Sequence, residues 1–391
     1  MRKQGPGVEG GKPRRVAHVL WRLSKGGGIP VVVRSIVSGI DPSQVELHLV
    51  TLRPLFPEDE LGSLPSNVRI QVLGHSGELS PWDRLCVMIQ VAARLKRLRP
   101  DVVQAHTGTA WMSLLARCVL PRKRFLLEVH DAPRSGRHRH STDWFEGLLA
   151  RRFGFHPICH STSVQSDVAT AWRVPPSNGH RFPLGIDTEL FWPQQIDEQR
   201  WRSTNGLPAD RPLVLYVARL VPTKNVALFI DVAGRVIRAN PKNAPVFAVI
   251  AGGPERDMLR ERISSQGLKD DVFLLPPRYG KELAEAYAAA DIFCSTSDYE
   301  GFGLAVVEAM SSGLPVVATR VGGHTDLVVE GTTGVLADKG DRDELCRAIN
   351  KLLADLPAAR QMGEAGRQRA MALFDVDAMV RAFEACYVPQ R

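Results

Sequence analysis

Short runs of β-branched and other apolar residues alternate along the chain with longer amphipathic stretches. This alternation is typical of βαβ units that build a parallel sheet. In the first half the pattern predicts helices between the strands, for example over 82–99 and 144–153. It predicts strands there over 15–21, 45–51, 68–73, 102–105, 125–129 and 157–160.

A polar stretch over 191–212, with three prolines and two tryptophans, separates this series from a second one and is expected to be a linker. The second series has predicted helices over 226–240 and 283–290, and a last amphipathic helix is predicted over 375–387. Its predicted strands are 213–217, 246–251, 272–275, 292–295, 316–318 and 334–336.

The two series predict an α/β chain of two Rossmann-like domains facing a central cleft, with ligand bound at the carboxyl ends of the strands. We place the first domain at 1–190 and the linker with the second domain at 191–374. We expect the C-terminal segment 375–391 to pack back on the first domain.

The composition is that of a globular protein, since 44% of the 391 residues are hydrophobic and 24% are charged. No apolar run approaches the ~18 residues of a membrane span, and the N-terminus lacks the apolar core of a secretory signal. Six cysteines lie far apart with no Cys-x-x-Cys, which indicates buried thiols of a reducing compartment. We therefore expect a cytoplasmic protein.

The net charge of +8 is concentrated in the first half of the chain. Residues 1–200 carry 27 Lys and Arg against 18 Asp and Glu, a net +9, whereas residues 201–391 carry 23 against 24, a net −1. Such asymmetry indicates an anionic partner for the first half, and a merely soluble surface is the alternative.

The segment 298–313 holds the most informative candidate chemistry. Gly301 and Gly303 allow a tight turn between a strand and a helix, and a helix start of this kind suits a phosphate. Glu308 is the one charge in the apolar run 304–310, and a buried carboxylate is costly without a polar partner. A ligand diol such as a ribose is one such partner, and an exposed helix glutamate is the alternative.

A second candidate site follows the first strand of the second half. Arg219 and Lys224 stand five residues apart where this strand ends, and together they could clamp a diphosphate. Two solvated loop cations are the alternative for this pair.

Taken together, these motifs resemble the retaining glycosyltransferases of family four, which have the GT-B fold. The resemblance covers nearly the whole chain and rests on motifs in the family's order and spacing. These are Gly27-Gly28, His130-Asp131, Pro183-Leu184-Gly185-Ile186-Asp187, Arg219-x4-Lys224, Ala251-Gly252-Gly253-Pro254, Glu300-x7-Glu308 and Gly322-Gly323-His324.

The resemblance implies transfer of a sugar from a nucleotide-sugar donor, such as a UDP-sugar or GDP-mannose, with retention of configuration. The residues with implied catalytic roles are His130, Glu300, Arg219 and Lys224. Those implied to bind the donor are Gly27, Gly28, Arg219, Lys224, Gly253, Arg278, Tyr279, Glu300, Gly301, Phe302, Gly303, Leu304 and Glu308. Glu300 would lie near the sugar hydroxyls, Glu308 would hold the ribose, and Arg278 and Tyr279, with Pro277, would face the base.

We expect no metal and no cofactor, because the cations and the helix dipole can carry the diphosphate charge. Asp375-Val376-Asp377 and Asp341 with Glu344 stand at predicted helix starts and are interpreted as caps. His138-x-His140, in the basic loop 134–140, lacks a third ligand; we interpret that loop as solvated, with acceptor contact as the alternative.

Several positions depart from the family pattern. They are Ala218, Asn225, Pro276-Pro277, Thr296 and Leu184. None removes a charged group, and the change at Pro276-Pro277 weakens any assignment of the base.

No nucleophilic triad stands out, so we expect a front-face reaction in which the leaving phosphate accepts the proton of the acceptor. A GT-B nucleotide-sugar epimerase is the alternative enzyme, and a non-enzymatic nucleotide-sugar sensor the alternative outside enzymes. A dinucleotide oxidoreductase would need Gly-x-Gly-x-x-Gly, which Gly26-Gly27-Gly28-Ile29-Pro30 does not supply.

We expect an anionic or membrane-associated acceptor and no nucleic acid, with the protein cytoplasmic or peripheral on the inner membrane face. Basic residues expected to contribute are Arg94, Arg97, Arg99, Arg122, Lys123 and Arg124. The helix 82–99 is interpreted as a core helix, because apolar residues recur along one face. That face comprises Leu85, Val87, Met88, Val91, Leu95 and Leu98.

Overall fold

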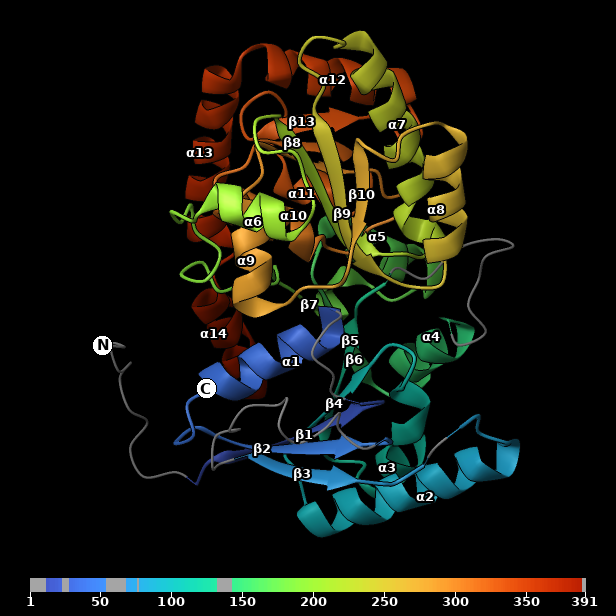
Figure 1. Cartoon of the computed structure of the whole chain (residues 1–391). Coiled ribbons are helices and arrows are strands. Elements are labelled where there is room, and N and C mark those ends of the chain that lie inside the picture. Colours follow the sequence, from blue (N-terminus) through green and yellow to red (C-terminus); the bar gives the residue numbers. More distant parts are fainter. Residues whose placement is uncertain (1–11, 23–27, 54–67, 76, 132–142, 389–391) are drawn as a thin grey trace. The chain divides into compact units, whose positions relative to one another are not determined.

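The structure is a computed structural model that describes residues 12–22, 28–53, 68–75, 77–131 and 143–388. Contacts divide the chain into two compact units (Figure 1). Unit 1 is Met1–Pro183 with Asp377–Arg391, and unit 2 is Leu184–Val376. The boundary lies at 183/184 rather than at the expected 190/191, because Ile186 exchanges backbone hydrogen bonds with Phe374 and Val376.

Unit 1 is built on a parallel sheet whose strand order is β3-β2-β1-β4-β5-β6-β7. Side chains of β1, β2, β4 and β5 are almost all buried, as in a sheet covered on both faces. The strands are β1 (Arg14–Leu20), β2 (Val45–Thr51), β3 (Val68–Val72), β4 (Val102–His106), β5 (Arg124–Val129), β6 (Phe155–Cys159) and β7 (His180–Arg181).

In unit 1 a helix lies between β1 and β2 and between each later pair of consecutive strands from β3 to β7, which makes these connections βαβ crossovers, whereas the connection from β2 to β3 lies mostly outside the described residues. The helices are α1 (Gly28–Gly39), α2 (Pro81–Leu98), η2 (Ala110–Ser113), α3 (Leu114–Val119), α4 (Asp143–Arg152), α5 (Thr162–Ala171) and η3 (Pro176–Asn178). Ser80 and Asp83 form a capping box that fixes the start of α2.

Unit 2 has a parallel sheet of strand order β10-β9-β8-β11-β12-β13. Its strands are β8 (Leu213–Arg219), β9 (Val246–Gly252), β10 (Val272–Leu275), β11 (Ile292–Ser295), β12 (Val316–Thr319) and β13 (Gly334–Ala337). The strand order reverses between β8 and β11, so the loops after these two strands lie side by side at one edge of the sheet.

Among the helices of unit 2, α7 packs on α8 and α12, α10 packs on α13, and α12 packs on α13. The bounds are α6 (Glu198–Thr204), η4 (Pro222–Lys224), α7 (Val226–Ala239), α8 (Arg256–Ser265), α9 (Gly280–Ala288), α10 (Leu304–Ser311), α11 (His324–Leu327), α12 (Arg342–Ala354) and α13 (Leu356–Leu373).

The last helix, α14 (Val376–Tyr387), packs within unit 1 although it follows unit 2 in the chain. Phe383 lies edge-on to Phe182 with 4.8 Å between ring centroids, and the Arg124 guanidinium donates to the Cys386 carbonyl. Tyr387 is fully buried and hydrogen bonds to side chains of β1 and β4.

The predicted strands and helices agree with the structure to within a few residues at their ends, but the linker contains the helix α6. This helix is too short for an amphipathic period to reveal it. It is held by Asp197 at its N-cap and by Arg202, which is buried and paired with Glu198 over 2.7 Å.

The interpretation of helix 82–99 as a core helix is wrong in part. Val87, Val91 and Leu95 are buried, but Leu85 is 40% exposed. Trp82 and Ile89, on the same outer face, are 75% and 53% exposed. The thiols of Cys86 and Cys118 are also exposed rather than buried, and none of the six cysteines is paired.

The caps expected at two helix starts differ from one another. Asp341 accepts from the amide of Glu344 over 2.9 Å, as an N-cap does, but the Glu344 carboxylate accepts from Asp338. Asp375, just before α14, accepts from the Thr188 hydroxyl over 3.0 Å, and its role as a cap stays a prediction.

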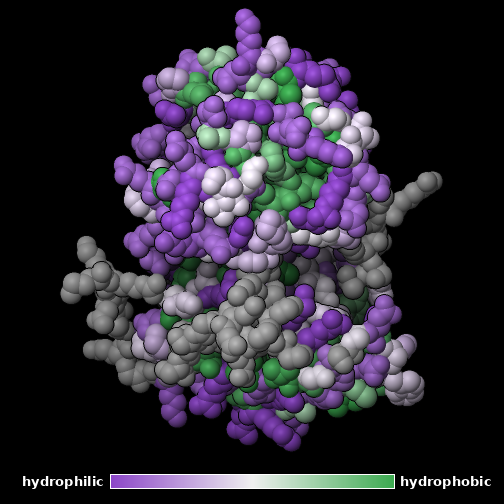
Figure 2. Space-filling view, viewed as in Figure 1, coloured by the Kyte–Doolittle hydropathy of each residue, from purple (hydrophilic) through white to green (hydrophobic). Residues whose placement is uncertain are grey.

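In the part of the chain that the structure describes, no helix has the length and apolarity to cross a membrane. Figure 2 shows hydrophilic residues over most of the visible face, with hydrophobic colour in separate areas, one of them over the edge strand β10 and its neighbour β9.

Candidate active site

In unit 2 the loops after β8 and β11 are joined by hydrogen bonds. The amide of Asp298 donates to the Thr223 carbonyl over 2.9 Å, and the Thr296 hydroxyl donates to the Asn225 carbonyl over 2.9 Å. The Asn225 side chain caps α7 and donates to Asp298. Asn225 has a φ of 44°, a left-handed conformation that glycine and asparagine adopt at low cost, which explains asparagine where the family has glycine.

Lys224 and Glu300 form an ion pair at this junction, with 2.6 Å between Nζ and Oε2. Both side chains are 17% exposed. The buried hydroxyl of Tyr216 donates to the Lys224 carbonyl over 2.7 Å, and the Ser297 hydroxyl donates to Glu300 over 3.2 Å. Burial opposes ionisation of Glu300, but the Lys224 ammonium keeps the pKa of this carboxyl below its usual value.

Two glycines allow the turn before α11 to lie directly against the Glu300 loop. A Cβ at Gly322 would lie 1.9 Å from the Glu300 carbonyl oxygen, and one at Gly323 would lie 2.1 Å from that of Phe302. The amide of Gly323 donates to the Glu300 carbonyl over 2.8 Å. These contacts fix the backbone of 300–303 immediately before α10, which begins after Gly303 at a φ of 107°.

Buried His324 completes the surroundings of Glu300. Its Nδ1 donates to the Thr319 carbonyl over 2.9 Å, and its Nε2 lies 3.9 Å from Glu300 Oε2. Burial lowers the pKa of His324, so the ring is neutral at pH 7. Phe302 is also buried and packs edge-on against Phe374, so its backbone rather than its ring is available to a ligand.

Glu308 has a protein partner that the sequence did not reveal. The hydroxyl of Tyr287 on α9 donates to Glu308 Oε2 over 2.8 Å, and Tyr287 is fully buried. Burial raises the pKa of Glu308 to about 7. Its Oε1 makes no hydrogen bond to the residues that the structure describes, so one carboxylate oxygen is left for a ligand.

The remaining predicted donor residues of unit 2 lie at or near the same edge of the sheet. Arg219 ends β8, is exposed, and has no ion pair within the described ranges. Gly253 follows β9, where a Cβ on the preceding Gly252 would touch Pro277 at 2.8 Å. Arg278 binds Glu282 and Asn205 over 3.2 and 3.3 Å. Tyr279 is 47% exposed, and Leu304 is the half-buried first residue of α10.

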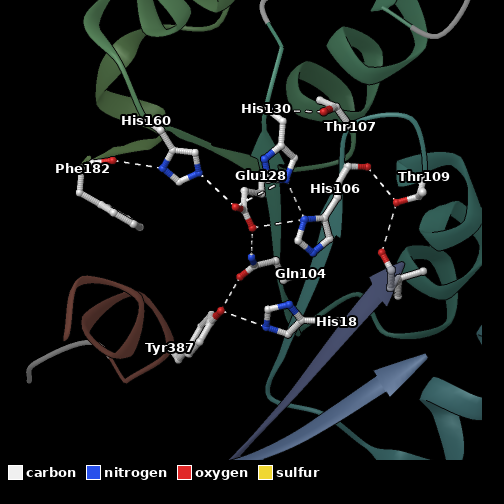
Figure 3. A network of polar contacts seen from close by, with 11 residues as sticks. His18, Gln104, His106, Thr107, Thr109, Glu128, His130, His160, Phe182 and Tyr387 are labelled. Carbon is white, nitrogen blue, oxygen red and sulfur yellow. Dashed lines mark hydrogen bonds and ion pairs between the residues drawn. The ribbon is translucent and has the colours of Figure 1, made fainter. Parts of the chain in front are cut away.

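In unit 1 the predicted residue His130 follows β5 and borders a buried polar network (Figure 3). Its amide donates to the Thr107 hydroxyl over 3.3 Å, and its Nε2 lies 3.0 Å from Nδ1 of His106. The His130 side chain is 11% exposed. Gly28 begins α1, whereas Gly27 and the basic loop 134–140 lie outside the described residues.

The fully buried carboxylate of Glu128 is the centre of this network. It accepts from the Gln104 amide and faces Nε2 of His160 at 3.1 Å and Nδ1 of His106 at 3.3 Å. Despite its burial, the neighbouring imidazoles hold the pKa of Glu128 far below its usual value. Sequence reasoning missed Glu128, although a lone acid in the apolar strand β5, two residues before His130, was a usable signal.

His106, Glu128 and His130 are also close enough together to share a metal ion. However, the planes of the two imidazoles lie within 6° of each other, and the nitrogens meet in a direct hydrogen bond. A zinc ion ~2.0–2.1 Å from both nitrogens would lie off the line between them. The hydrogen bond accounts for the contact, and the absence of a metal requirement stays a prediction.

Comparison with known proteins matches both halves of the chain to glycosyltransferases. Residues 197–369 match the family described as glycosyl transferases group 1, and residues 26–190 match glycosyltransferase family 4. GDP-mannose-dependent alpha-(1-6)-phosphatidylinositol monomannoside mannosyltransferase of Mycolicibacterium smegmatis is 36% identical over 297 residues, 72% of this chain and 75% of that protein. A D-inositol 3-phosphate glycosyltransferase of Acidothermus cellulolyticus is 37% identical over 369 residues, 89% of this chain and 79% of that protein.

Solved structures of low identity share the architecture. HepE of Anabaena in complex with UDP and glucose has a TM-score of 0.81 at 22% identity, covering 96% of this chain and 99% of that one. Sucrose-phosphate synthase of Thermosynechococcus elongatus has a TM-score of 0.79 at 21% identity, covering 96% and 98%. The predicted α/β GT-B fold is confirmed. The chain therefore belongs to family 4 of the glycosyltransferases, the group 1 enzymes of GT-B fold.

Proposed function

We propose that the protein transfers a hexosyl group from a nucleotide-sugar donor to an acceptor hydroxyl, with retention of configuration and without a metal. The observation that carries the proposal is the Lys224–Glu300 ion pair, held where the loops after β8 and β11 are joined. It presents one cation and one carboxylate at the start of α10, where the helix dipole favours an anion. No observation favours an epimerase instead.

In this mechanism the donor diphosphate interacts with Arg219, Lys224 and the first amides of α10. Negative charge grows on the diphosphate as the glycosidic bond breaks, and donors already in place stabilise it without reorganisation. Glu300, kept ionised beside Lys224, accepts hydrogen bonds from sugar hydroxyls. When the diphosphate binds, it competes with Glu300 for the Lys224 ammonium.

Glu308 is proposed to hold the ribose diol with its free oxygen, while Tyr287 holds the other. Arg278 and Tyr279 are proposed to face the base, and His130 in unit 1 is proposed to donate a hydrogen bond to the reacting sugar. The leaving phosphate then takes the proton of the attacking acceptor hydroxyl, so the protein needs no separate base on the acceptor side.

The donor is proposed to be GDP-mannose or a UDP-sugar. The mannosyltransferase relative at 36% identity is named for GDP-mannose, and HepE was solved with UDP. A thermal-shift panel of UDP-, GDP- and ADP-linked sugars separates these cases, because a ligand at 100 times its dissociation constant adds ~2.7 kcal/mol of stability.

The acceptor is proposed to be an anionic inositol-type or membrane-associated molecule. Relatives are named for D-inositol 3-phosphate and a phosphatidylinositol mannoside, and residues 1–200 carry the whole positive excess. Two of the expected basic contributors are engaged otherwise, since Lys123 pairs with Asp101 and Arg124 binds Cys386. The exposed cations left near the end of α2 are Lys96, Arg97, Arg99 and Arg122.

The proposal is tested by incubating the protein with the stabilising donor and inositol phosphate or phosphatidylinositol, with and without a chelator. The expected product is an α-linked glycoside, because both candidate classes include α-configured donors, and its anomeric configuration is read by NMR. An inverted product would overturn retention. Activity that is lost in chelator and restored by a divalent ion would overturn metal independence. An epimerised sugar formed from donor alone would favour the epimerase.

A further inference from the structure

The polar network below His130 determines where each of its protons lies (Figure 3). Tyr387 donates its single hydroxyl proton to Oε1 of Gln104 over 2.6 Å. His18 Nε2, 3.1 Å from the same hydroxyl, must then be the donor to Tyr387. The amide of Gln104 is therefore oriented with its NH₂ group toward Glu128, and Glu128 must accept.

His160 contacts Glu128 from the other side. Its Nδ1 lies 3.1 Å from the Phe182 carbonyl oxygen, which can only accept, so Nδ1 is the donor there. Its Nε2 lies 3.1 Å from Oε1 of Glu128. The imidazoles around Glu128 hold the pKa of this carboxyl far below its usual value, so Glu128 faces them as a carboxylate.

His106 Nδ1 lies between this carboxylate and His130. Oε2 of Glu128 is 3.3 Å away and Nε2 of His130 is 3.0 Å away. A lone pair on Nδ1 facing a carboxylate is unfavourable, so the proton of the neutral His106 ring lies on Nδ1. The other nitrogen of His106, Nε2, is buried and has no hydrogen-bond partner among the described residues. No neighbouring acceptor therefore draws the proton of the ring to Nε2.

His130 Nε2 also faces Glu128, but Oε1 lies 3.5 Å away, farther than the 3.3 Å between His106 Nδ1 and Oε2. The shorter contact favours His106 as the donor in the hydrogen bond between the two rings, which leaves the single proton of His130 on Nδ1. Burial lowers the pKa of both His106 and His130, so both rings are neutral at pH 7. His130 Nδ1 makes no hydrogen bond within the part of the chain that the structure describes. The protonated Nδ1 of His130 is therefore available as a donor, on the more exposed of the two rings, His130 and His106.

We propose that His106 and Glu128 are positioning residues that hold His130 in the tautomer protonated at Nδ1, so that His130 offers the sugar a hydrogen-bond donor. The role of the tautomer in transfer rests on the proposed function, whereas the tautomer itself does not. The effect resembles the way in which a histidine bound to a metal is oriented by the partner of its other ring nitrogen, but without a metal.

The tautomer is measured on the whole chain labelled with 15N-histidine, by NMR at neutral pH without substrate. The His130 signals are assigned by their loss in His130→Gln. We expect a protonated Nδ1 and an unprotonated Nε2 for His130, and the same pattern for His106. A protonated Nε2 on His130 in the unaltered protein would overturn the proposal.

Two substitutions of His106 separate positioning from packing. Asn has an amide nitrogen near the place of Nδ1, so His106→Asn keeps the donor, whereas His106→Phe removes it. We expect His106→Phe to shift His130 toward a mixture of tautomers and to lower kcat about tenfold, the loss of one hydrogen bond. His106→Asn should keep the His130 tautomer and most of the activity.

His48→Phe is the matched control, because His48 is another buried histidine of the same sheet and is bound to Glu46 over 3.1 Å. It should cost comparable stability and leave the His130 signals unchanged. Equal effects of His106→Phe and His106→Asn on the His130 signals would contradict positioning. The zinc content of the purified protein is also measured. One zinc per chain in the unaltered protein, absent from both His106→Phe and His106→Asn, would make the cluster of His106, Glu128 and His130 a metal site and overturn the proposal. A correct tautomer without transferase activity would instead refute the proposed function alone.

Discussion

The hydroxyl of Tyr287 donates to Oε2 of Glu308 over 2.8 Å, and the two residues come from adjacent helices, α9 and α10. The same hydroxyl oxygen lies 3.2 Å from the Ala305 carbonyl oxygen, which places it against the first turn of α10. The phenol thus fixes the direction in which the carboxylate points, and the second carboxylate oxygen has no hydrogen-bond partner among the described residues. In the proposed function this oriented oxygen is the acceptor for the ribose diol.

We predict that Glu308→Ala raises the donor KM by roughly one to two orders of magnitude, with a smaller effect on kcat. Hydrogen bonds to a charged group contribute ~1.5–3 kcal/mol, and a ribose is bound equally in the ground and transition states. Steady-state kinetics with the preferred donor check this. An unchanged KM would remove Glu308 from the ribose site.

Tyr287→Phe removes the orienting hydroxyl and keeps the ring that packs edge-on to Phe191. We expect a rise of the donor KM of about five- to tenfold, the equivalent of one net hydrogen bond. The acceptor KM should not move. A lower kcat at unchanged donor KM would place Tyr287 in the chemical step instead.

Donor affinity should depend on pH through Glu308, whose pKa burial raises to about 7. A ribose diol donates more strongly to the ionised carboxylate than to the neutral acid, so affinity should fall as the pH drops through about 7. Without donor, the folded protein binds a proton at Glu308 more tightly than the unfolded chain does. Glu308 therefore contributes to the free energy of unfolding at low pH, and this contribution is lost as the pH rises through about 7. Calorimetric titration across this range measures the affinity, and Glu308→Gln should flatten its pH dependence.

We expect Arg219→Ala to lower kcat by about 10²–10³, because removing one donor to the developing diphosphate charge typically has this cost. Arg219 is exposed and unpaired among the described residues, so its loss should leave the melting temperature unchanged. Arg260→Ala on α8, which removes an exposed cation paired with Asp257, is the control and should remain active. A stable, fully active Arg219→Ala enzyme would contradict the clamp.

Lys224→Ala should also lower kcat, but with a structural consequence that Arg219→Ala lacks. It leaves Glu300 without the ammonium that keeps its pKa low, so Glu300 would bind a proton more readily. The pH profile of kcat should therefore move its acidic limb upward in Lys224→Ala and stay in place in Arg219→Ala. If the pH profiles of kcat of the two variants coincide, Glu300 is not the group whose protonation limits turnover at low pH.

The sheets and their βαβ order could be predicted, because the periodicity of buried strands and the positions of glycines are local signals. The same signals place the candidate donor-binding residues at the carboxyl ends of the strands, and their role stays a prediction. The loop after β11 is an example, since Gly303 and the acids around it stand within a few residues of one another. The partners of these acids could not be predicted in the same way. Tyr287 lies 21 positions before Glu308, on another helix, and the two side chains meet only in the folded protein.

The network below His130 depends on even longer separations. Tyr387 meets Gln104 across 283 positions, because α14 packs on unit 1. Glu128 was within reach of sequence reasoning, since a buried strand with one acid needs a polar partner. Which histidines supply that partner follows from the strand order, and this pairing of β4, β5 and β6 emerges only in the folded sheet.

Exposed apolar residues on α2 predict binding to a membrane surface. Trp82 and Ile89 are 75% and 53% exposed on one face of the helix, and Lys96 and Arg97 stand on exposed positions of its last turn. An apolar stripe beside cations suits an interfacial helix, and each cation near an anionic surface contributes up to ~1 kcal/mol, screened beyond ~8 Å at physiological salt.

We therefore expect the protein to sediment with phosphatidylcholine vesicles that contain phosphatidylinositol, and less with phosphatidylcholine alone, in a salt series. Trp82→Ser with Ile89→Ser should weaken binding at every salt concentration, because it removes the apolar term. Lys96→Gln with Arg97→Gln should weaken it mainly at low salt, because it removes the screened term. Leu373→Ser, at another exposed apolar position, is the control. If the unaltered protein binds neither kind of vesicle at low salt, the positive excess of residues 1–200 serves solubility rather than membrane binding. That result would favour a soluble inositol phosphate as the acceptor.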